Sequence, residues 1–476
     1  MAKNKITTQS QDFSQWYLDV IKEADLAEYS KVKGCMIIKP YGYRIWELIQ
    51  REMDDRIKAA GVQNCYFPLF IPESFINREK EHVKGFAPEC AIVTHGGGKK
   101  LAENLYVRPT SETIMYDTFS EWVQSYRDLP LLINQWANIV RWEMRTRPFL
   151  RTTEFLWQEG HTAHATLEEA DIEAARALKM YNDFDKNFLA LPVLTGKKSR
   201  KETFAGALYT LATEALAKDG KAIQAGTSHN LGQGFAKSFN IQYQDEKGEL
   251  QYVWQTSWGV STRLIGTIIV VHGDDHGLVL PPKVAPYQIV IIPIYKTDQE
   301  KDKVLEFVEN MKDSFDKNLR VHVDNRENLS PGFKFNEWEV KGAPIRIEVG
   351  PKDLEKDQVV LFRRDTLEKM SIESGNMKKE VDKLLSEIQE NIYKKALEFQ
   401  KENTFSVNDY NEFKNLISEK SGFYKAYFCC DAKVEEKIQD ETKATIRVIL
   451  DEDVKGKRCF YCGGEATQEV VFAKAY

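Results

Sequence analysis

The chain has few cysteines, no long apolar run and no excess of positive charge. Seven cysteines among 476 residues are too few for a disulfide framework, which favours the cytosol over a secreted protein. No apolar run approaches the ~18 residues that a membrane-spanning helix needs. The first five residues precede no apolar core, so we expect no secretory signal. These absences predict a cytoplasmic protein with no membrane partner.

The charge balance limits the class of partner. A net charge of −6 argues against a protein coated in positive charge, and we expect no DNA partner, although a local basic patch could still meet nucleic acid. With 42% hydrophobic and 29% charged residues the composition is that of an ordinary globular protein. The length suffices for about three domains.

Residues 141–161 carry arginines, carboxylates and aromatic rings where a core strand would carry Val, Ile or Leu. The pattern predicts two strands joined by a basic turn at 145–148, and alternate residues of a strand share a face. Arg141 and Glu143 would share one face of the first strand. The second strand would present Arg151, Thr153, Phe155, Trp157, Glu159 and His161 on one face. An edge strand is the simpler alternative, but two such strands favour the floor of a site for an anionic, ring-bearing ligand.

Three other polar segments suit such a site. Residues 108–113 predict a helix start, whose N–H groups, hydroxyls and carboxylate suit an amino acid. Residues 226–234 are polar and rich in glycine, which fits a surface loop and an active-site loop equally well. Residues 257–266 predict a strand-to-helix turn with Arg263 early in the helix, where it can hold a phosphate. Residues 95–100 lack the spacing of a phosphate-binding loop and predict a hairpin tip.

Hydrophobic periodicity predicts the remaining elements. Apolar spacing indicates helices at 11–29 and 43–60, and a strand at 65–70 whose proline implies an edge or a chain interface. Pro281-Pro282 marks a boundary. Alternating strands and helices then predict an α/β domain of about a hundred residues. Its cations are either salt-bridged or form a nucleic-acid patch; they are Arg326, Lys334, Arg346, Arg363 and Arg364.

The C-terminal region, after a long helix at 377–399, holds four cysteines. Cys459 and Cys462 have a zinc-knuckle spacing. Cys429 and Cys430 do not, because two neighbouring residues rarely both reach one tetrahedral ion.

Together these segments resemble the prolyl-tRNA synthetases of class II, in the form common to archaea and eukaryotes. The resemblance runs from about residue 12 to 476 and is most specific at 108–113, 134–136, 148–151, 154–161, 226–229 and 278–282. It implies an α+β class II catalytic core over 1–284, an antiparallel sheet flanked by helices. It also implies an α/β anticodon-binding domain over 285–376 and a small α/β, zinc-domain-like C-terminal module over 377–476.

The resemblance also implies roles for residues. The helix ending near Gly61, with Pro68, matches motif 1, which builds a homodimer interface. Motifs 2 and 3 supply catalytic arginines, Arg141 and Arg263. The ATP-binding positions are Arg141, Glu143, Arg151, Thr152, Phe155, Gln224, Thr227, Ser261 and Arg263. The proline-binding positions are Thr110, Glu112, Arg141, Trp157, Glu159, Phe204 and His229.

The implied reaction joins proline to tRNA(Pro) with ATP and Mg²⁺. The proline carboxylate is already a nucleophile, so the reaction needs charge neutralisation and alignment rather than an activated Ser, Cys or His. In the anticodon-binding domain, the candidates for reading bases are Arg326, Glu327, Lys334, Glu339 and Arg346. The C-terminal Tyr476 matches a family residue whose carboxylate reaches toward the catalytic domain.

Two departures and two alternatives bear on this interpretation. Val434 stands where the family has a second zinc cysteine. Cys429, Cys459 and Cys462 could therefore bind Zn²⁺ with Cys430 or water as the fourth ligand, or the site could bind no zinc. We favour the last of these. The hundred residues between motifs 2 and 3 leave no room for an editing domain. A non-catalytic, tRNA-binding or regulatory relative would have lost a nucleotide-site arginine, and a deacylase would lack motifs 2 and 3.

Overall fold

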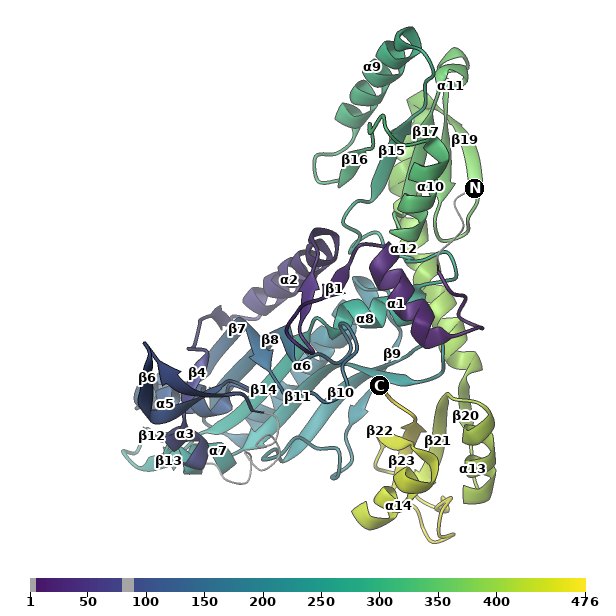
Figure 1. The fold of residues 1–476 in the computed structure, drawn as a ribbon. Coiled ribbons are helices and arrows are strands. Elements are labelled where there is room, and N and C mark those ends of the chain that lie inside the picture. The colour runs from purple at the N-terminus through teal and green to yellow at the C-terminus, as the bar shows by residue number, and fades with distance from the viewer. Residues whose placement is uncertain (1–5, 79–89) are drawn as a thin grey trace.

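The fold is organised around an eleven-stranded sheet with the order β20-β21-β23-β22-β9-β10-β11-β14-β8-β7-β3 (Figure 1). The structure, a computed structural model, describes residues 6–78 and 90–476, so the segment on which the secretory-signal prediction rests lies outside it. The central strands are antiparallel: β7 (Leu131–Val140), β8 (Glu154–His164), β9 (Val193–Lys197), β10 (Tyr209–Leu216), β11 (Ala222–Gly232) and β14 (Trp254–Ser261). This confirms the antiparallel sheet flanked by helices.

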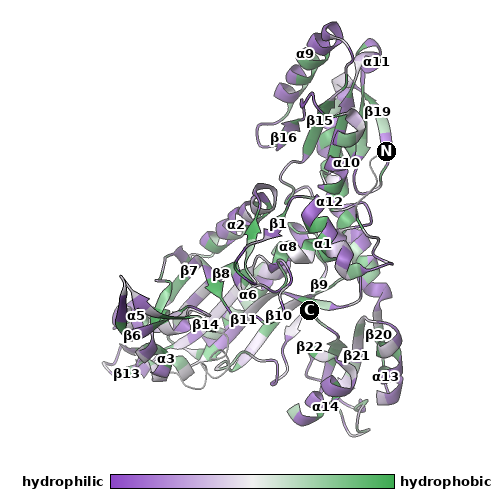
Figure 2. Cartoon of the chain, viewed as in Figure 1, coloured by the Kyte–Doolittle hydropathy of each residue, from purple (hydrophilic) through white to green (hydrophobic). Residues whose placement is uncertain are grey.

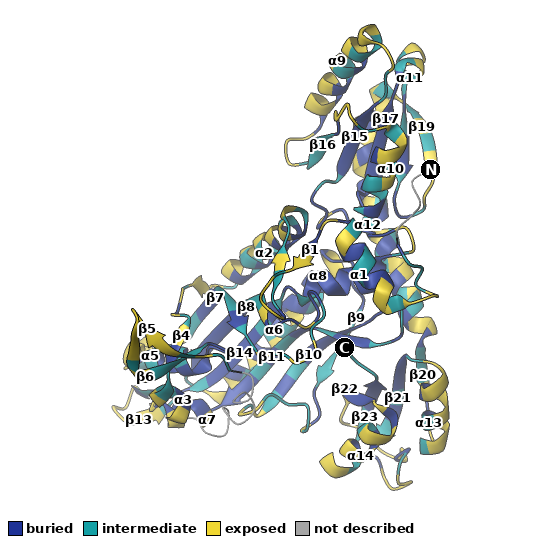
Figure 3. Ribbon diagram, in the orientation of Figure 1, coloured by how far each residue is buried: buried dark blue, intermediate teal, exposed yellow. Residues whose placement is uncertain are grey.

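Helices cover one face of this sheet and exclude water from it. These are α1 (Phe13–Glu23), α2 (Pro40–Ala59), α6 (Leu167–Asn187) and α8 (Arg263–His272). The apolar stripe that predicts α2 is buried, from Ile45 through Ile49 and Met53 to Ile57. Leu264 to His272 of α8 are buried throughout. Figure 3 shows the buried sheet strands against the more exposed outer helices.

The end of the sheet near β3 (Gln63–Asn64) carries smaller elements. They are β4 (Phe70–Pro72), α3 (Glu73–Arg78), β5 (Ile92–Gly96), β6 (Lys99–Val107), α5 (Glu112–Trp122), η2 (Tyr126–Asp128), α7 (Gly234–Ser238), β12 (Gln242–Gln244) and β13 (Leu250–Tyr252). Strands β1 (Ala27–Tyr29) and β2 (Met36–Ile38) pair with each other beside α1 instead (Figure 1). Strands β5 and β6 form the predicted hairpin, with Gly97 and Gly98 at positive φ in its tip. The predicted helix start at 108–113 is the start of α5.

Three local predictions are wrong. The first helix ends at Glu23, and Asp25 follows with φ +62°. Residues 65–69 form no strand, because Pro68 has no N–H to give to a ladder. Residues 226–232 belong to β11 rather than to a loop, because β10 and β14 on either side supply the backbone partners that their weak strand propensity does not predict.

The two strands predicted within 141–161 are offset from their expected position. Strand β7 ends at Val140 and β8 begins at Glu154, so residues 141–153 form a long loop. Pro148 lacks an N–H and Phe149 has φ +60°, and both interrupt strand pairing. Arg141 and Glu143 therefore follow the first strand instead of lying on it.

The second body is the predicted α/β domain, with the sheet order β16-β15-β17-β18-β19. Its elements are β15 (Ile289–Pro293), α9 (Asp298–Ser314), β16 (Val321–Val323), α10 (Pro331–Val340), β17 (Ile345–Val349), α11 (Pro351–Glu355), β18 (Gln358–Arg363) and β19 (Lys369–Glu373), followed by η3 (Ser374–Asn376). Every residue of β15 and β17 is buried. Figure 2 shows hydrophobic residues in the sheets and hydrophilic residues on outer helices such as α9.

The third body is joined through the sheet itself to the first body, which holds the central strands and the helices that cover them. It comprises α12 (Met377–Glu402), β20 (Thr404–Ser406), α13 (Tyr410–Glu419), β21 (Phe423–Phe428), α14 (Ala432–Thr442), β22 (Thr445–Asp451) and β23 (Gln468–Ala473). Ile449 of β22 pairs with Lys197 of β9, so one sheet continues from the central strands into this module. No helix among the described residues is long and apolar enough to cross a bilayer.

Candidate functional site

A cavity of about 260 Å³ lies over β8, β11 and β14, on the face opposite α6. Alternation along β8 explains the placement: Phe155, Trp157, Glu159 and His161 line the cavity, whereas the side chain of Gln158 accepts a hydrogen bond from Tyr181 of α6 at 2.8 Å. Its predicted lining residues are Thr110, Glu112, Arg141, Phe155, Trp157, Glu159, Phe204, Gln224, Thr227, His229, Ser261 and Arg263. Residues distant in sequence therefore meet at one pocket.

One end of the pocket is cationic. Arg141 Nε donates to the carbonyl of Pro109 at 2.9 Å, and its guanidinium lies over the Phe155 ring at 5.6 Å. Arg263, in the first turn of α8, donates from Nε to the carbonyl of Leu150 at 3.2 Å. Burial, and then the charge of Arg141, lowers the pKa of Arg263. Two guanidinium groups that disfavour each other's charge make a site for an anion.

A second part of the pocket contains two buried carboxylates, Glu112 and Glu159. The Thr110 hydroxyl donates to Glu112 Oε2. Glu159 Oε1 accepts from Ser111 at 2.6 Å and from Gln135 at 2.8 Å. These bonds fix both carboxylates facing the same cavity, where they suit an ammonium group.

His161 lines the cavity beside these carboxylates. Its Nε2 lies 3.1 Å from Glu159 Oε2, and its Nδ1 lies 3.0 Å from the Tyr116 hydroxyl. Burial lowers the pKa of His161, but the hydrogen bond to Glu159 and the charge of both carboxylates outweigh burial and raise it. The two carboxylates therefore stabilise the protonated form of this imidazole.

A third wall is formed by a histidine and an aromatic ring. His229 Nδ1 lies 2.8 Å from the Thr210 hydroxyl, and its ring packs on Phe204 with centroids 4.7 Å apart. Burial lowers the pKa of His229 to about 4, so this imidazole is neutral at pH 7. It presents a flat, uncharged surface between the two charged ends.

Three predicted nucleotide contacts lie outside the cavity walls, in the loop between β7 and β8. Arg151 is exposed and donates from Nε to Glu143 Oε2 at 2.6 Å. The Thr152 hydroxyl donates to the carbonyl of Glu154 at 2.7 Å. The loop therefore carries an ion pair at the rim of the cationic end.

Sequence reasoning misses several lining residues, among them Glu202, Thr210 and Ser257. Glu202 lies in an irregular segment, for which neither periodicity nor a motif gives a signal. Thr210 and Ser257 could have been found, because each lies on a strand in register with predicted site residues: Thr210 faces His229, and Ser257 faces both His229 and His161.

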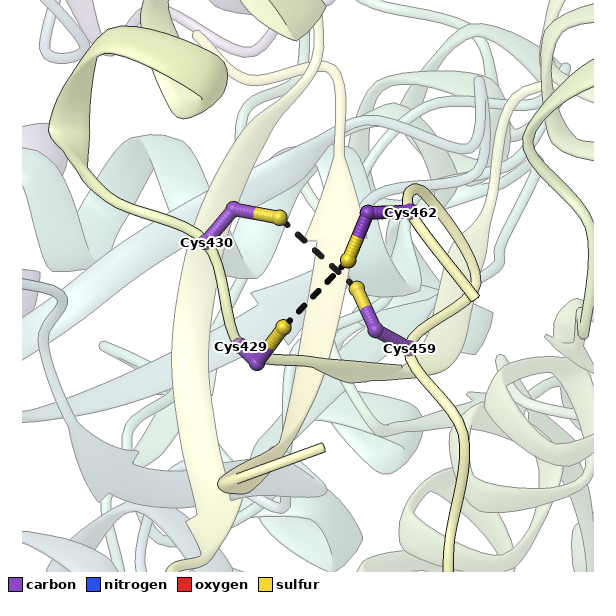
Figure 4. A group of neighbouring side chains, drawn as sticks. All are labelled: Cys429, Cys430, Cys459 and Cys462. Carbon is purple, nitrogen blue, oxygen red and sulfur yellow. Dashed lines mark hydrogen bonds between the residues drawn. The ribbon is translucent and has the colours of Figure 1, made fainter. Parts of the chain in front are cut away.

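The four C-terminal cysteines form a cluster whose sulfurs all lie within 4.8 Å of one another (Figure 4). Cys429 Sγ lies 3.5 Å from Cys462 Sγ, and Cys430 Sγ lies 3.8 Å from Cys459 Sγ. The neighbouring Cys429 and Cys430 therefore both contribute their sulfurs to one cluster, an arrangement that the sequence pattern does not favour. The chain leaves β21 and turns into α14 at this point, so neither strand alternation nor helix geometry separates the two side chains. Val434 packs against the apolar core of the module instead.

The cations of the second body are paired with carboxylates. The pairs are Arg326–Asp324, Lys334–Asp324, Arg346–Glu348, Arg363–Asp365 and Arg364–Asp274. Lys334, Arg346 and Arg364 are also buried. Of the remaining candidates for base contact, Glu327 pairs with Lys301, and Glu339 with His276. These pairs favour the salt-bridged interpretation over an open cationic patch.

Comparison with known proteins yields matches along the whole chain. Family models described as the tRNA synthetase class II core domain (G, H, P, S and T), the anticodon binding domain and the prolyl-tRNA synthetase C-terminal domain match residues 94–272, 288–390 and 410–476. The proline–tRNA ligase of Natranaerobius thermophilus is 55% identical over 474 residues, covering 99% of this chain and 98% of the relative. That of Roseiflexus sp. is 54% identical over 482 residues, covering all of both chains. The crystal structure of prolyl-tRNA synthetase from Cryptosporidium parvum, complexed with halofuginone and AMPPNP, matches with a TM-score of 0.94 and 43% identity over 99% of each chain.

Proposed function

Because the chain belongs to the prolyl-tRNA synthetase family, we propose that the cavity over β8, β11 and β14 is where this proline–tRNA ligase activates its amino acid. One observation carries the assignment: two arginines and two buried carboxylates face the same cavity. The arginines suit the phosphates of ATP and the carboxylate of proline. The buried carboxylates suit the secondary ammonium.

In the first step a carboxylate oxygen of proline attacks the α-phosphorus of ATP, bound as its magnesium complex, and pyrophosphate leaves. Arg141 and Arg263 neutralise the charge that develops on the phosphorus oxygens. Phe155 stacks on adenine, while Gln224, Thr227 and Ser261 line the nucleotide position. Glu143, Arg151 and Thr152 would join these contacts from the loop at the rim. The terminal ribose hydroxyl of tRNA(Pro) then attacks the carbonyl of the adenylate, and AMP leaves.

Proline would lie with its ammonium on Glu112 and Thr110 and its ring among apolar and aromatic groups. Trp157, Phe204 and the neutral His229 surround that volume. Glu159 holds His161 and Ser111 in place and adds negative charge. A small pocket of this kind favours a ring over a linear side chain of similar size by shape and by desolvation.

The four cysteines fit a structural Zn²⁺ site, which replaces our expectation of no tight metal. Tetrahedral Zn–S bonds of about 2.3 Å place sulfurs about 3.8 Å apart. The two sulfur pairs, at 3.5 and 3.8 Å, match that spacing. We therefore assign Cys429, Cys430, Cys459 and Cys462 as ligands, with Cys430 taking the role that Val434 leaves vacant. Bound zinc would tie the end of β21 to the loop before β23.

The assignment extends to tRNA, subgroup, assembly and compartment. The second body would bind the anticodon stem. We place the chain in the archaeal and eukaryotic subgroup, because residues 165–253 build α6 and strands of the core and leave no separate editing domain.

Exposed Tyr66, Phe70 and Trp122 near β3 favour a homodimer interface there. Sedimentation at twice the 54.9 kDa of one chain would support it, and a monomer would refute it. We expect the enzyme to work in the cytoplasm.

The decisive experiment is amino-acid-dependent exchange of pyrophosphate into ATP without tRNA, comparing proline, alanine and cysteine. We expect exchange with proline to exceed exchange with the other two by at least about a hundredfold in kcat/KM. Equal exchange with alanine would refute the ring-specific pocket. No exchange with any amino acid, either without tRNA or after adding it, would refute the assignment of this cavity.

A further inference from the structure

The segment between β9 and β10, residues 198–208, forms one wall of the proposed proline pocket and is held by the C-terminal module. Glu202 and Phe204 of this segment line the cavity. The Ser199 hydroxyl donates to Glu435 Oε1 of α14 at 2.8 Å. Lys201 Nζ donates to the Gln439 side chain one turn further along the same helix. One face of α14 therefore holds a wall of the proposed proline pocket through hydrogen bonds.

Ser199 organises the turn that leads to the pocket. Its carbonyl accepts from the amide of Glu202 at 3.1 Å and from the Thr203 hydroxyl at 2.9 Å. Its hydroxyl also accepts from the amide of Glu202 at 3.3 Å. The amide of Phe204 then donates to the Thr210 hydroxyl at 3.0 Å, which brings the Phe204 ring against His229. A short chain of hydrogen bonds thus runs from Glu435 to the aromatic wall.

The contact is buried, which gives it energetic weight. Ser199 and Glu435 are both 4% exposed. Burial raises the pKa of Glu435, the largest effect, and the hydrogen bond from Ser199 lowers it only in part. A buried carboxyl without a hydrogen-bonding partner would destabilise the fold, so the bond from Ser199 matters for how this contact is held.

A second buried contact fixes the base of the same segment. Arg447 of β22 donates from Nη2 and Nε to Glu214 of β10, at 2.8 and 3.1 Å. Lys198, the first residue of the segment, donates to Glu214 Oε1 at 2.6 Å. Glu214 is fully buried, so this charged group is the anchor between β10 and the third body. Residues 198 and 199 are therefore held from one side, while Phe204 faces the pocket on the other.

We propose that Glu435 is a positioning residue for proline binding: through Ser199 it sets segment 198–208 and so places Phe204 and Glu202 in the pocket. This inference rests on the proposed location of proline. It gives the C-terminal module a part in the recognition of proline that does not involve contact with tRNA. Since the segment touches the proline end, the effect falls on the KM for proline and not on the KM for ATP.

The test compares Glu435→Ala, Glu435→Gln and the control Glu436→Ala in proline-dependent pyrophosphate exchange. Glu436 is the exposed neighbour on the same helix. Loss of one buried hydrogen bond predicts a rise of about tenfold in the KM for proline in Glu435→Ala, with kcat and the KM for ATP within about threefold of wild type. Glu435→Gln keeps an acceptor for Ser199 and should restore most of the affinity. Glu436→Ala should behave as wild type.

Ser199→Ala tests the same chain from its other end. It should raise the KM for proline as Glu435→Ala does, and the double variant should be no worse than either alone, because both remove one interaction. If Glu435→Ala does not fold by thermal melting, Ser199→Ala carries the test. Unchanged KM for proline, equal losses for proline and ATP, or additive effects would overturn the inference. Wild-type enzyme that shows no proline-dependent exchange would instead refute the proposed site, and with it this role.

Discussion

At the scale of single residues, the chemistry of the pocket depends on how two guanidinium groups are held. Arg141 is fixed by the carbonyl of Pro109, and Arg263 by the carbonyl of Leu150. Both of these bonds come from Nε, the guanidinium nitrogen nearest the chain, and they hold the two charges in place at one end of the cavity. Preorganised charge of this kind is the main source of transition-state stabilisation.

Replacing Arg141 should abolish adenylate formation while leaving the fold intact. In Arg141→Ala we expect kcat for pyrophosphate exchange to fall by two to three decades, about 3 kcal/mol, because one charge that faces the reacting phosphate is lost. Thermal melting should change little, since the side chain lies at the edge of a cavity. The matched control is Arg127→Ala, an exposed arginine outside the pocket. Exchange at wild-type rate in Arg141→Ala would overturn the phosphate assignment.

Individual residues were the most predictable level of the site. Arginine, glutamate and aromatic side chains at 141–161 stand out because such groups are rarely placed on a strand without a ligand, and Phe155, Trp157 and Glu159 do line the pocket. Glu202 and Ser199 gave no signal. Ser199 matters because it contacts Glu435, more than two hundred positions away, and Glu202 because it lines the pocket; no local pattern contains that information.

At the scale of elements, the contact of α6 with β10 contains a buried carboxyl, Asp185, which is 1% exposed. Burial raises its pKa from 3.8 to about 7, although the Thr213 hydroxyl lowers it in part. Between about pH 4 and 7 the folded chain therefore keeps a proton that the unfolded chain has lost. Stability contributed by this group falls as pH rises through that window, by about 1.4 kcal/mol for each pH unit.

Asp185→Asn should remove this part of the pH dependence. We expect the Tm at pH 5 minus the Tm at pH 8 to be smaller in the variant than in wild type, whatever the absolute Tm. Asp183→Asn, two residues earlier on the same helix and half-buried, is the control and should keep the wild-type difference. Scanning calorimetry at the two pH values measures it. An unchanged difference in Asp185→Asn would show that the carboxyl stays ionised in the fold.

Elements with strong periodicity were predicted well, and those shaped by neighbours were not. The strands and helices that alternate after Pro281-Pro282 form the predicted α/β domain, because buried apolar runs such as Ile345–Val349 specify them locally. The segment 226–232 was expected as a loop, since glycine and asparagine disfavour strands. It is a strand because pairing with β10 and β14 outweighs propensity, and its small side chains leave room for the pocket.

At the scale of the whole molecule, the three bodies are connected by more than linkers. Figure 1 shows α12 running from the second body to the third, past the catalytic core. Arg364 of the second body, 1% exposed, donates to both oxygens of Asp274, just beyond the end of α8. Arg263 begins that same helix. Such contacts join distant sequence positions, so the order of domains follows from the sequence but their arrangement does not.

The zinc assignment makes the last prediction, and it depends on this long-range organisation. Two sulfurs come from the chain between β21 and α14 and two from the loop before β23, so a bound ion would clamp the third body, from which Glu435 reaches the pocket. We expect about one zinc per chain by elemental analysis, and Cys430→Ser should lose most of it and lower the Tm. Cys35→Ser, a half-buried thiol outside the cluster, should keep both. Full zinc content in Cys430→Ser would show that the adjacent pair supplies one ligand and not two. A metal-free wild-type protein that gains no stability from added zinc would remove the assignment altogether.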